Sequence, residues 1–135
     1  MKWLQSDKNP LRVSVRSSSR GGHLWSGYSV CEGGLVIDVS RLNSMSVIKG
    51  GRYARLGPGV EQGWANRMMA PYHRMFPTSG DCNQFAFGGF VQGGGFSLFA
   101  RGHGLAADYL VEATVVLADG SIVVASGNNE YADLW

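Results

Sequence analysis

Two residues with nucleophilic side chains, His23 and Cys82, each lie in a glycine-rich segment of the sequence. His23 ends residues 20–23, which read Arg-Gly-Gly-His, and Cys82 follows residues 77–81, which read Pro-Thr-Ser-Gly-Asp. Glycine takes up positive φ readily and lets the backbone approach a ligand closely. Two such segments, each with a side chain that can form a covalent bond, suggest a large flat or phosphorylated ligand held between them.

The segment 16–29 around His23 carries groups that bind anions. Backbone N–H groups in a glycine turn form an anion-binding nest, and the guanidinium groups of Arg16 and Arg20 can pair with a phosphate in bidentate fashion. Three serines, at residues 17–19, add hydroxyl groups. On their own, these residues fit an ordinary surface loop as well as they fit a pyrophosphate cradle.

Each reactive residue also has an ordinary structural interpretation. A single histidine such as His23 is more often structural or solvent-exposed than reactive, and a single cysteine such as Cys82 is more often a small buried hydrophobe. We expect His73 and His103 to be structural or exposed, because neither lies in a comparable context. Cys31 is expected to be structural, and a disulfide between Cys31 and Cys82 is left open.

The elements that position these segments can be predicted from hydrophobic periodicity and turn residues. Residues 11–16 alternate apolar and polar side chains, as a half-buried strand does, and residues 35–39 form an apolar run typical of a buried strand. Residues 45–48 and 52–56 are predicted to be the two arms of a hairpin around Gly50-Gly51.

Helices and a second hairpin are predicted further along the chain. Residues 61–72 have the clearest helical periodicity, and a second helix is expected to begin near Gly93, because Val91 and Leu98 lie seven residues apart. The predicted apolar stripe of the first helix consists of Val60, Trp64 and Met68, widened by Ala65, Met69 and Tyr72.

The end of the chain predicts a hairpin of two strands. Residues 109–117 and 121–125 are rich in β-branched residues, and Ala118-Asp119-Gly120 between them contains the Asp-Gly pair that is typical of a tight turn. Residues 128–135 begin like a helix. The whole pattern predicts the α+β class, with a small mixed or antiparallel sheet flanked by helices.

Composition and charge restrict the classes of function. Glycine makes up 20 of 135 residues, and apolar residues make up 44%, so a globular chain with many tight turns is expected. Twelve basic and ten acidic residues are well mixed and give a net charge of +2, which does not favour a nucleic-acid partner. No window approaches the ~18 apolar residues of a membrane span. We expect a cytoplasmic protein, or a secreted one if the N-terminus is truncated.

Other common cofactor motifs are missing from the sequence. It contains no G-x-G-x-x-G for a Rossmann dinucleotide site, no Gly-Lys pair for a P-loop and no G-x-S-x-G for a serine nucleophile. The two cysteines and three histidines show no zinc-binding spacing.

At residues 20–23 and 80–82 the sequence resembles the flavoprotein oxidases with a PCMH-type FAD-binding domain, in particular their berberine bridge enzyme-like branch. Many members of that branch bond FAD covalently through a histidine in a G-G-H loop and a cysteine in a G-x-C loop. The glycine turns at 88–89 and 93–95 and the segment 101–120 match the family as well, so the resemblance covers nearly all of residues 12–135.

The resemblance implies which residues bind the cofactor. His23 would bond the 8α-methyl group of the flavin and Cys82 its C6 atom. The second bond is the less strongly indicated, because bulky Phe85 and Phe87 follow Cys82 and are expected to crowd the ring. The implied cofactor-binding residues are Arg20, Gly21, Gly22, His23, Gly80, Asp81, Cys82, Gly88, Gly89, Gly93, Gly94, Gly95 and Asp108.

The resemblance also implies an activity and its limits. Enzymes of the family transfer a hydride from a small-molecule substrate to the flavin and pass the electrons to O₂. They are several times longer than this chain, so residues 1–135 are expected to be a second FAD-binding subdomain, truncated at both ends, with no substrate domain. We expect no activity from the chain alone. The alternative is a non-catalytic remnant or binding module that keeps the fold without productive flavin.

Overall fold

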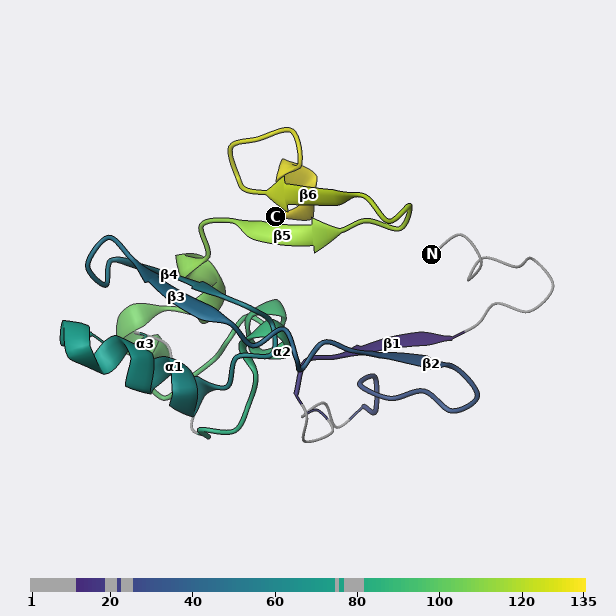
Figure 1. Cartoon of the computed structure of the whole chain (residues 1–135), viewed down its shortest axis with the longest axis horizontal. Helices are drawn as coiled ribbons and strands as arrows, with labels where there is room; N and C mark the ends of the chain where they lie inside the picture. Colours follow the sequence, from purple (N-terminus) through teal and green to yellow (C-terminus); the bar gives the residue numbers. More distant parts are fainter. Residues whose placement is uncertain (1–11, 19–21, 23–25, 75, 77–81) are drawn as a thin grey trace. The chain divides into compact units, whose positions relative to one another are not determined.

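The computed structural model describes residues 12–18, 22, 26–74, 76 and 82–135 (Figure 1). Residues 12–108 form one compact unit, and residues 109–135 belong to a second. The elements, in chain order, are β1 (Val13–Arg16), β2 (Leu35–Asp38), β3 (Met45–Ile48), β4 (Tyr53–Leu56), α1 (Gln62–Met69), the 3₁₀ turn η2 (Ala70–Tyr72), α2 (Phe87–Gln92), α3 (Ala100–His103), η3 (Ala106–Tyr109), β5 (Ala113–Val116), β6 (Ile122–Ala125) and η4 (Ala132–Leu134). Small sheets with few helices confirm the predicted α+β class.

Strands β1 and β2 form a parallel pair, in which Val13 lies opposite Leu35 and Arg16 opposite Asp38. The predicted strands at residues 11–16 and 35–39 are therefore confirmed. Their burial differs from the prediction. Val13 and Val15 are 42% and 60% exposed while Ser14 is buried, and β2 is half-buried with Asp38 exposed. The alternation of apolar and polar residues predicts only that the two faces of a strand differ. It does not predict which face of β1 other parts of the protein cover.

Strands β3 and β4 form the predicted antiparallel hairpin, with Met45 opposite Leu56 and Ile48 opposite Tyr53. Gly51 has a φ of +88°, and a Cβ added there would lie 2.8 Å from Cβ of Tyr72. Both the backbone angle and the close approach of Tyr72 therefore require glycine at this turn.

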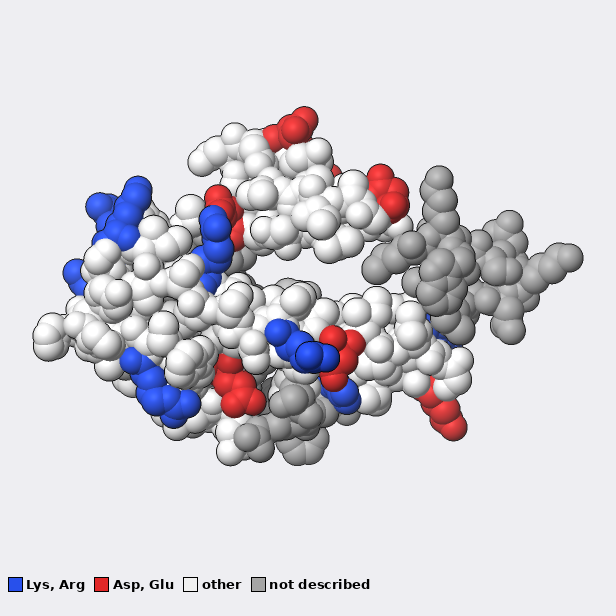
Figure 2. Space-filling view, viewed as in Figure 1, with Lys and Arg blue, Asp and Glu red and all other residues white. Residues whose placement is uncertain are grey.

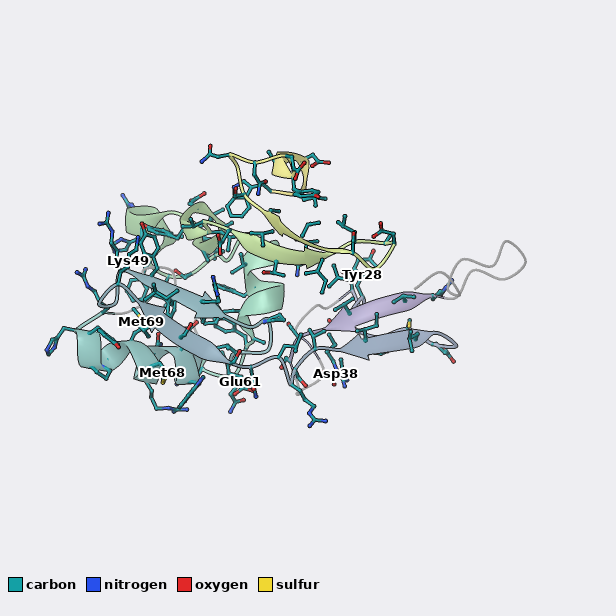
Figure 3. All side chains as sticks on the ribbon, turned by 45° about the horizontal axis from the view of Figure 1, so that its top comes forward. Tyr28, Asp38, Lys49, Glu61, Met68 and Met69 are labelled. Carbon is teal, nitrogen blue, oxygen red and sulfur yellow. The ribbon has the colours of Figure 1, made fainter. Side chains whose placement is uncertain are left out.

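Helix α1 packs against β3 and is shorter than predicted, because the 3₁₀ turn η2, which contains Pro71, follows it directly. Ala65 and Met69 are buried, but Trp64 is 44% exposed and Met68 half-buried. The predicted apolar stripe through Trp64 and Met68 is thus wrong, and the buried face of α1 is the one that carries Ala65 and Met69. Figure 3 labels both methionines on α1.

The wrong face of α1 was predicted because the helical period was counted from Val60. It is fully buried, yet it precedes the helix, which begins at Gln62 after an extended Glu61. A residue in extended backbone does not share the helical period, so counting four residues from Val60 selects the wrong face. Val60, Ala65 and Phe87 form a core cluster against which further apolar side chains pack, namely Met45, Leu56, Phe76, Phe90 and Val91.

The helix expected to begin near Gly93 is wrong in position. Helix α2 precedes Gly93 and ends there, and the next two residues, Gly94 and Gly95, have φ values of +87° and +73° that break the helix. Leu98 is 75% exposed. Its spacing from Val91 therefore does not mark a shared helical face.

The second unit contains the predicted hairpin of β5 and β6, which pair antiparallel with Val116 opposite Ile122. Asp119 stabilises the turn, since its Oδ1 accepts a hydrogen bond from the N–H of Ser121 at 2.9 Å, and Gly120 has a φ of +89°. The first strand is shorter than predicted, because Tyr109 ends η3 and residues 110–112 and 117 are not in a strand. The helix expected in residues 128–135 is only the 3₁₀ turn η4.

Candidate functional site

The predicted cofactor-binding residues fall into two groups. Arg20, Gly21, His23, Gly80 and Asp81 lie outside the described residues. The structure describes Gly22, Cys82, Gly88, Gly89, Gly93, Gly94, Gly95 and Asp108. It therefore shows the segment that leads into the His23 loop, the residues that follow the Cys82 loop, and the glycine turns.

The segment leading to His23 is attached directly to α2. The backbone N–H of Gly89 donates a hydrogen bond to Oγ of Ser17 at 3.1 Å, although the two residues are 72 positions apart. Ser17 is the first residue after β1, and Figure 1 shows α2 beside that end of the strand. Two segments that the sequence assigned separately to the cofactor therefore lie together in the fold.

The N-terminal turn of α2 has acceptors within the protein. The N–H of Phe87 donates to the carbonyl of Val60 at 3.0 Å, and that of Gly88 donates to the carbonyl of Pro58 at 2.9 Å. Together with the bond from Gly89 to Ser17, these contacts satisfy donors that a helix N-terminus leaves without intrahelical partners. They are therefore not available to bind a phosphate, as helix N-termini often do.

The glycines of α2 are not equivalent. A Cβ added to Gly88 would lie 2.6 Å from Cβ of Pro58, so the packing of the protein itself excludes a side chain there. At Gly89 and Gly93 the nearest atoms would lie at 3.4 Å and 3.6 Å, which are ordinary contacts, and both residues are exposed. Gly89 lies within α2 and Gly93 is the residue at its C-terminal end, so neither position carries a side chain that would cover the backbone there.

Gly94 and Gly95 form a turn that pairs with η3. Ala106 donates its N–H to the carbonyl of Gly95, and Ala107 donates to that of Gly94, each at 3.1 Å. A Cβ on Gly95 would collide with the Cβ of Ala106. The close approach of these two backbones gives Gly95 a reason within the protein to be glycine.

Asp108 stabilises the turn before η3. Its Oδ2 accepts a hydrogen bond from the N–H of Leu105 at 2.8 Å, and a Cβ on Gly104 would lie 2.6 Å from the same oxygen. Gly104 has a φ of +76°. The carboxylate of Asp108 thus contacts the protein itself, at the segment that pairs with Gly94 and Gly95.

The two cysteines have different environments and are both free thiols. Sγ of the half-buried Cys31 lies 3.3 Å from the carbonyl oxygen of Leu35 and 3.6 Å from that of Arg12, which agrees with a structural role. Cys82 is exposed, and its sulfur accepts a hydrogen bond from the N–H of Gln84 at 3.4 Å. The disulfide left open by the sequence is therefore not formed.

The phenylalanines after Cys82 point mainly to the core. Phe87 is 7% exposed, and its ring centre lies 5.0 Å from that of Phe76. Phe85 is half-buried and packs on Phe90, with ring centres 4.4 Å apart. The expectation that Phe87 crowds a ligand beside Cys82 is wrong, because a strongly hydrophobic side chain at this position fills the core beside Val60.

The cation predicted at the start of the loop has an acidic partner. Nη2 of Arg16 donates to Oδ2 of Asp38 at 2.6 Å, and Oδ1 of Asp38 accepts the N–H of Ser40 at 2.9 Å. The pKa of Asp38 is held well below its usual range, first by hydrogen bonding to the Ser40 side chain and then by Arg16. The guanidinium of Arg16 therefore links β1 to β2, which the sequence interpretation did not anticipate. Figure 3 labels Asp38 at the end of β2.

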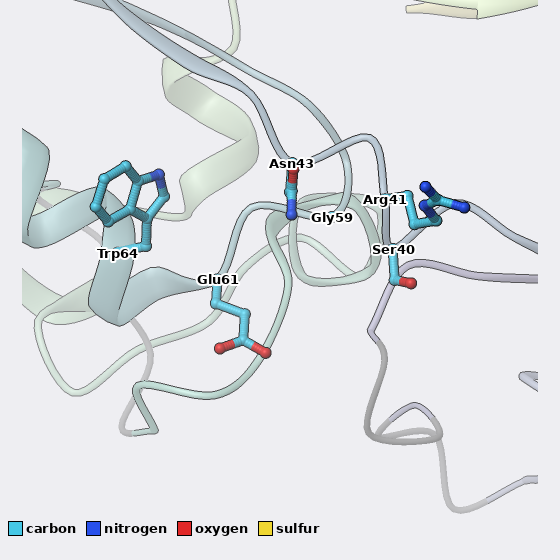
Figure 4. Close-up of a pocket in the computed structure, with 6 residues that line it drawn as sticks. All are labelled: Ser40, Arg41, Asn43, Gly59, Glu61 and Trp64. Carbon is cyan, nitrogen blue, oxygen red and sulfur yellow. The ribbon is translucent and has the colours of Figure 1, made fainter.

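An open hollow with a volume of about 520 Å³ lies elsewhere on the first unit (Figure 4). Its lining residues are Ser40, Arg41, Asn43, Gly59, Glu61 and Trp64. None of them was predicted to bind the cofactor. They come from two segments, residues 40–43 and residues 59–64, so no local sequence signal could have identified the hollow.

Charge, helix length and the placement of metal-binding side chains add three observations. In Figure 2 the Lys and Arg side chains on the visible face form separate groups, some of them beside Asp or Glu. In the described part of the chain, no helix has the length and apolar character needed to cross a membrane. The same residues contain no group of three or more His, Cys, Asp or Glu side chains arranged to hold a metal ion.

Comparison with known proteins identifies the family. Residues 4–126 match the model of the FAD binding domain. Over 115 residues the chain is 42% identical to an FAD-linked oxidoreductase, pynB, of Aspergillus niger. The match covers 85% of this chain and 21% of the relative.

Solved structures of flavoproteins have the same fold. A 6-hydroxy-D-nicotine oxidase from Arthrobacter nicotinovorans superposes with a TM-score of 0.80 at 32% identity, over 92% of this chain and 26% of the oxidase. A glucooligosaccharide oxidase of Acremonium strictum, whose crystal structure reveals a novel flavinylation, gives 0.75 at 28% identity, over 93% and 26%. A berberine bridge enzyme-like protein of Physcomitrella patens, at 24% identity, shares the fold with a TM-score of 0.77 over 89% and 26%.

The chain therefore spans about a quarter of the length of these relatives. The match to the family model covers most of the chain and includes both segments that carry His23 and Cys82. The chain belongs to the FAD binding domain family, and the relatives that it matches include FAD-linked oxidoreductases.

Proposed function

We propose that this chain is the FAD-binding part of an oxidase in which FAD is bonded covalently, through His23 and, less strongly indicated, through Cys82. The proposal rests on one observation above the others, the match of residues 4–126 to the FAD binding domain. When bound, FAD would supply the acceptor for a hydride from a small-molecule substrate and the electrons that reduce O₂. In the whole protein, residues of this chain bind and orient the cofactor.

The described residues fit such a cofactor in two respects. Gly89 on α2 and Gly93 at its end are exposed and carry no side chain, so that a flat ring can approach the backbone at these positions. The exposed thiol of Cys82 precedes α2 by a few residues and is accessible to a ligand. By contrast, Gly88, Gly95 and Asp108 support the site by holding the backbone of the first unit in place.

Anion binding is assigned to the His23 loop and not to α2. The first N–H groups of α2 already donate to Val60, Pro58 and Ser17. Arg16 is already paired with Asp38. We therefore assign the pyrophosphate of FAD to the backbone of Gly21 and Gly22 and to the side chain of Arg20.

The test of the covalent proposal uses denatured protein. Wild-type protein expressed with FAD should retain flavin fluorescence on a denaturing gel under reducing conditions. His23→Ala should lose most of this fluorescence, the double variant His23→Ala with Cys82→Ser should lose the remainder, and His73→Asn and Cys31→Ser serve as matched controls. Asparagine suits position 73, where φ is +51°.

The result separates the two candidate functions. Flavin that resists denaturation and depends on His23 supports the oxidase. Protein that folds but takes up no flavin supports a binding module that keeps the fold without it. Undiminished covalent flavin in the double variant of His23 and Cys82 would refute both assigned bonds.

A further inference from the structure

We propose that Ser17 is a positioning residue, whose hydroxyl group fixes the start of the His23 loop on α2 and so sets the loop against the face of that helix that carries Gly89. The inference rests on the proposed function for its consequence in FAD binding, but the contact itself stands on the structure. The sequence alone suggested a different role for Ser17, as one of three hydroxyl groups facing an anion.

The contact is a long-range helix cap. Helix α2 begins after Ala86, which has no side-chain acceptor for the first turn. A local Ser, Thr, Asp or Asn usually supplies that acceptor. Here Ser17, from a segment 72 residues earlier, accepts the N–H of Gly89 at 3.1 Å in its place. Removal of the hydroxyl would leave this donor without its partner.

Ser17 lies between the end of β1 and His23, so its contact with α2 affects where the His23 loop can lie. Ser17 directly follows Arg16, which is held by β2 through Asp38 and through its carbonyl, the acceptor of the N–H of Val39 at 2.8 Å. The loop therefore leaves a fixed strand end, and Ser17, a described residue of this loop, contacts the glycine-rich helix. Only a few residues separate Ser17 from His23, so the place of the hydroxyl restricts where the imidazole can reach.

The contact with Ser17 does not itself require glycine at position 89. A Cβ on Gly89 would lie 3.4 Å from Oγ of Ser17, at ordinary contact distance. The hydroxyl thus sits next to the face of α2 that carries Gly89. A serine hydroxyl that accepts one hydrogen bond still has its own hydrogen to donate, so the same group can also donate to a ligand on this face.

The first experiment measures the contact without reference to FAD. Amide hydrogen exchange at Gly89 is compared in wild-type protein, Ser17→Ala, Ser17→Thr and the control Ser46→Ala, a serine on exposed strand surface. Exchange at Gly89 should be about 2- to 10-fold faster in Ser17→Ala, the range for the loss of one hydrogen bond. It should return toward the wild-type rate in Ser17→Thr. Equal rates in wild type and Ser17→Ala would overturn the proposed contact.

The second experiment measures the consequence for FAD. The dissociation constant for FAD and the rate of covalent attachment at saturating FAD are determined for the same variants. Ser17→Ala should weaken binding about 2- to 10-fold and slow attachment, and Ser17→Thr should restore both. A purely structural serine would lower the melting temperature without slowing attachment at saturating FAD.

The outcomes distinguish this inference from the proposed function. If wild-type protein binds no FAD, the proposed function fails, and the exchange rates at Gly89 still decide whether Ser17 caps α2. If wild-type protein binds FAD and Ser17→Ala binds and attaches it equally well, the positioning role of Ser17 is wrong while the proposed function stands.

Discussion

Arg16 and Asp38, the last residues of two parallel neighbouring strands, are joined by a hydrogen-bonded ion pair of 2.6 Å. Ser40 donates its backbone N–H to the other oxygen of the same carboxylate. The pair engages Nη2 of the Arg16 guanidinium with a carboxylate of the protein and fixes the strand end from which the His23 loop leaves. It also makes the stability of this unit depend on the charge of one carboxylate.

The first prediction concerns acid. Because the Ser40 side chain and Arg16 lower the pKa of Asp38 in the folded protein, folding is favoured by the charged form. This contribution is complete above the ordinary pKa of about 4 and declines as the pH falls from there toward the lowered folded value.

Thermal unfolding of wild-type protein and Asp38→Asn should show this dependence. Wild type should be the more stable at neutral pH, and the difference in melting temperature should shrink below about pH 4. Asp133→Asn, an exposed acid in the second unit, is the control. A difference that stays constant down to pH 2.5, or grows, would exclude the ion pair as its cause.

The second prediction separates two adjacent glycines. Gly88→Ala should destabilise the protein by roughly 1–3 kcal/mol, since the new methyl group would collide with Pro58. Gly89→Ala should keep or raise stability, because alanine is favoured over glycine in a helix by about 1 kcal/mol. It should nevertheless weaken FAD binding if the ring lies against this face of α2.

Chemical denaturation measures the stability of the two variants, and FAD titration measures their affinity for the cofactor. Together they check that Gly88→Ala loses stability and Gly89→Ala loses FAD affinity. Gly102→Ala, which has no atom within 4 Å of the added carbon, is the control for a helical glycine. Unchanged FAD affinity in Gly89→Ala would place the cofactor on another face.

The third prediction concerns Gly22, the residue before His23. Gly22 has a φ of +88°, and its added Cβ would collide with the side chain of Ser29, whereas Gly27 has a φ of +75° and open space around it. Gly22→Ala should therefore lower the free energy of unfolding by more than Gly27→Ala. The loss in Gly27→Ala reflects backbone strain alone, about 1–3 kcal/mol. Flavin content and melting temperature of both variants test this. If both variants lose the same amount of each, the collision with Ser29 does not contribute to the cost of Gly22→Ala.

The fourth prediction concerns Asp108. Asp108→Ala should remove the acceptor of the Leu105 N–H and destabilise the turn by about 0.5–2 kcal/mol, as loss of a capping side chain does. Asp108→Asn keeps an acceptor oxygen and should lose less. If both variants retain stability but lose FAD, Asp108 contacts the cofactor directly and not through the turn.

Local signals predicted the hairpins correctly. Asp119-Gly120 and Gly50-Gly51 define turns within a few residues, and the strands beside them pair as expected. The buried face of α1 was missed because Val60 lies outside the helix, and α2 was misplaced because the acceptors for its first turn, such as Pro58 and Ser17, are distant in sequence.

The candidate site was predictable only in part. Resemblance supplied the residue types of both loops, and the structure adds that Gly88 and Gly95 serve internal packing whereas Gly89 and Gly93 leave the backbone open. The partner of Arg16 could not be predicted, because it depends on the register of β1 with β2. Neither could the bond between Ser17 and Gly89, which depends on how α2 packs on the strand end.

The central claim, that this chain binds FAD, is tested most directly by the absorption spectrum of protein purified with FAD and freed of unbound cofactor. The account predicts a stoichiometric yellow complex whose flavin remains with the protein after acid precipitation. A folded protein that is colourless after the same treatment, and that gives no shift in melting temperature on addition of FAD, would contradict it.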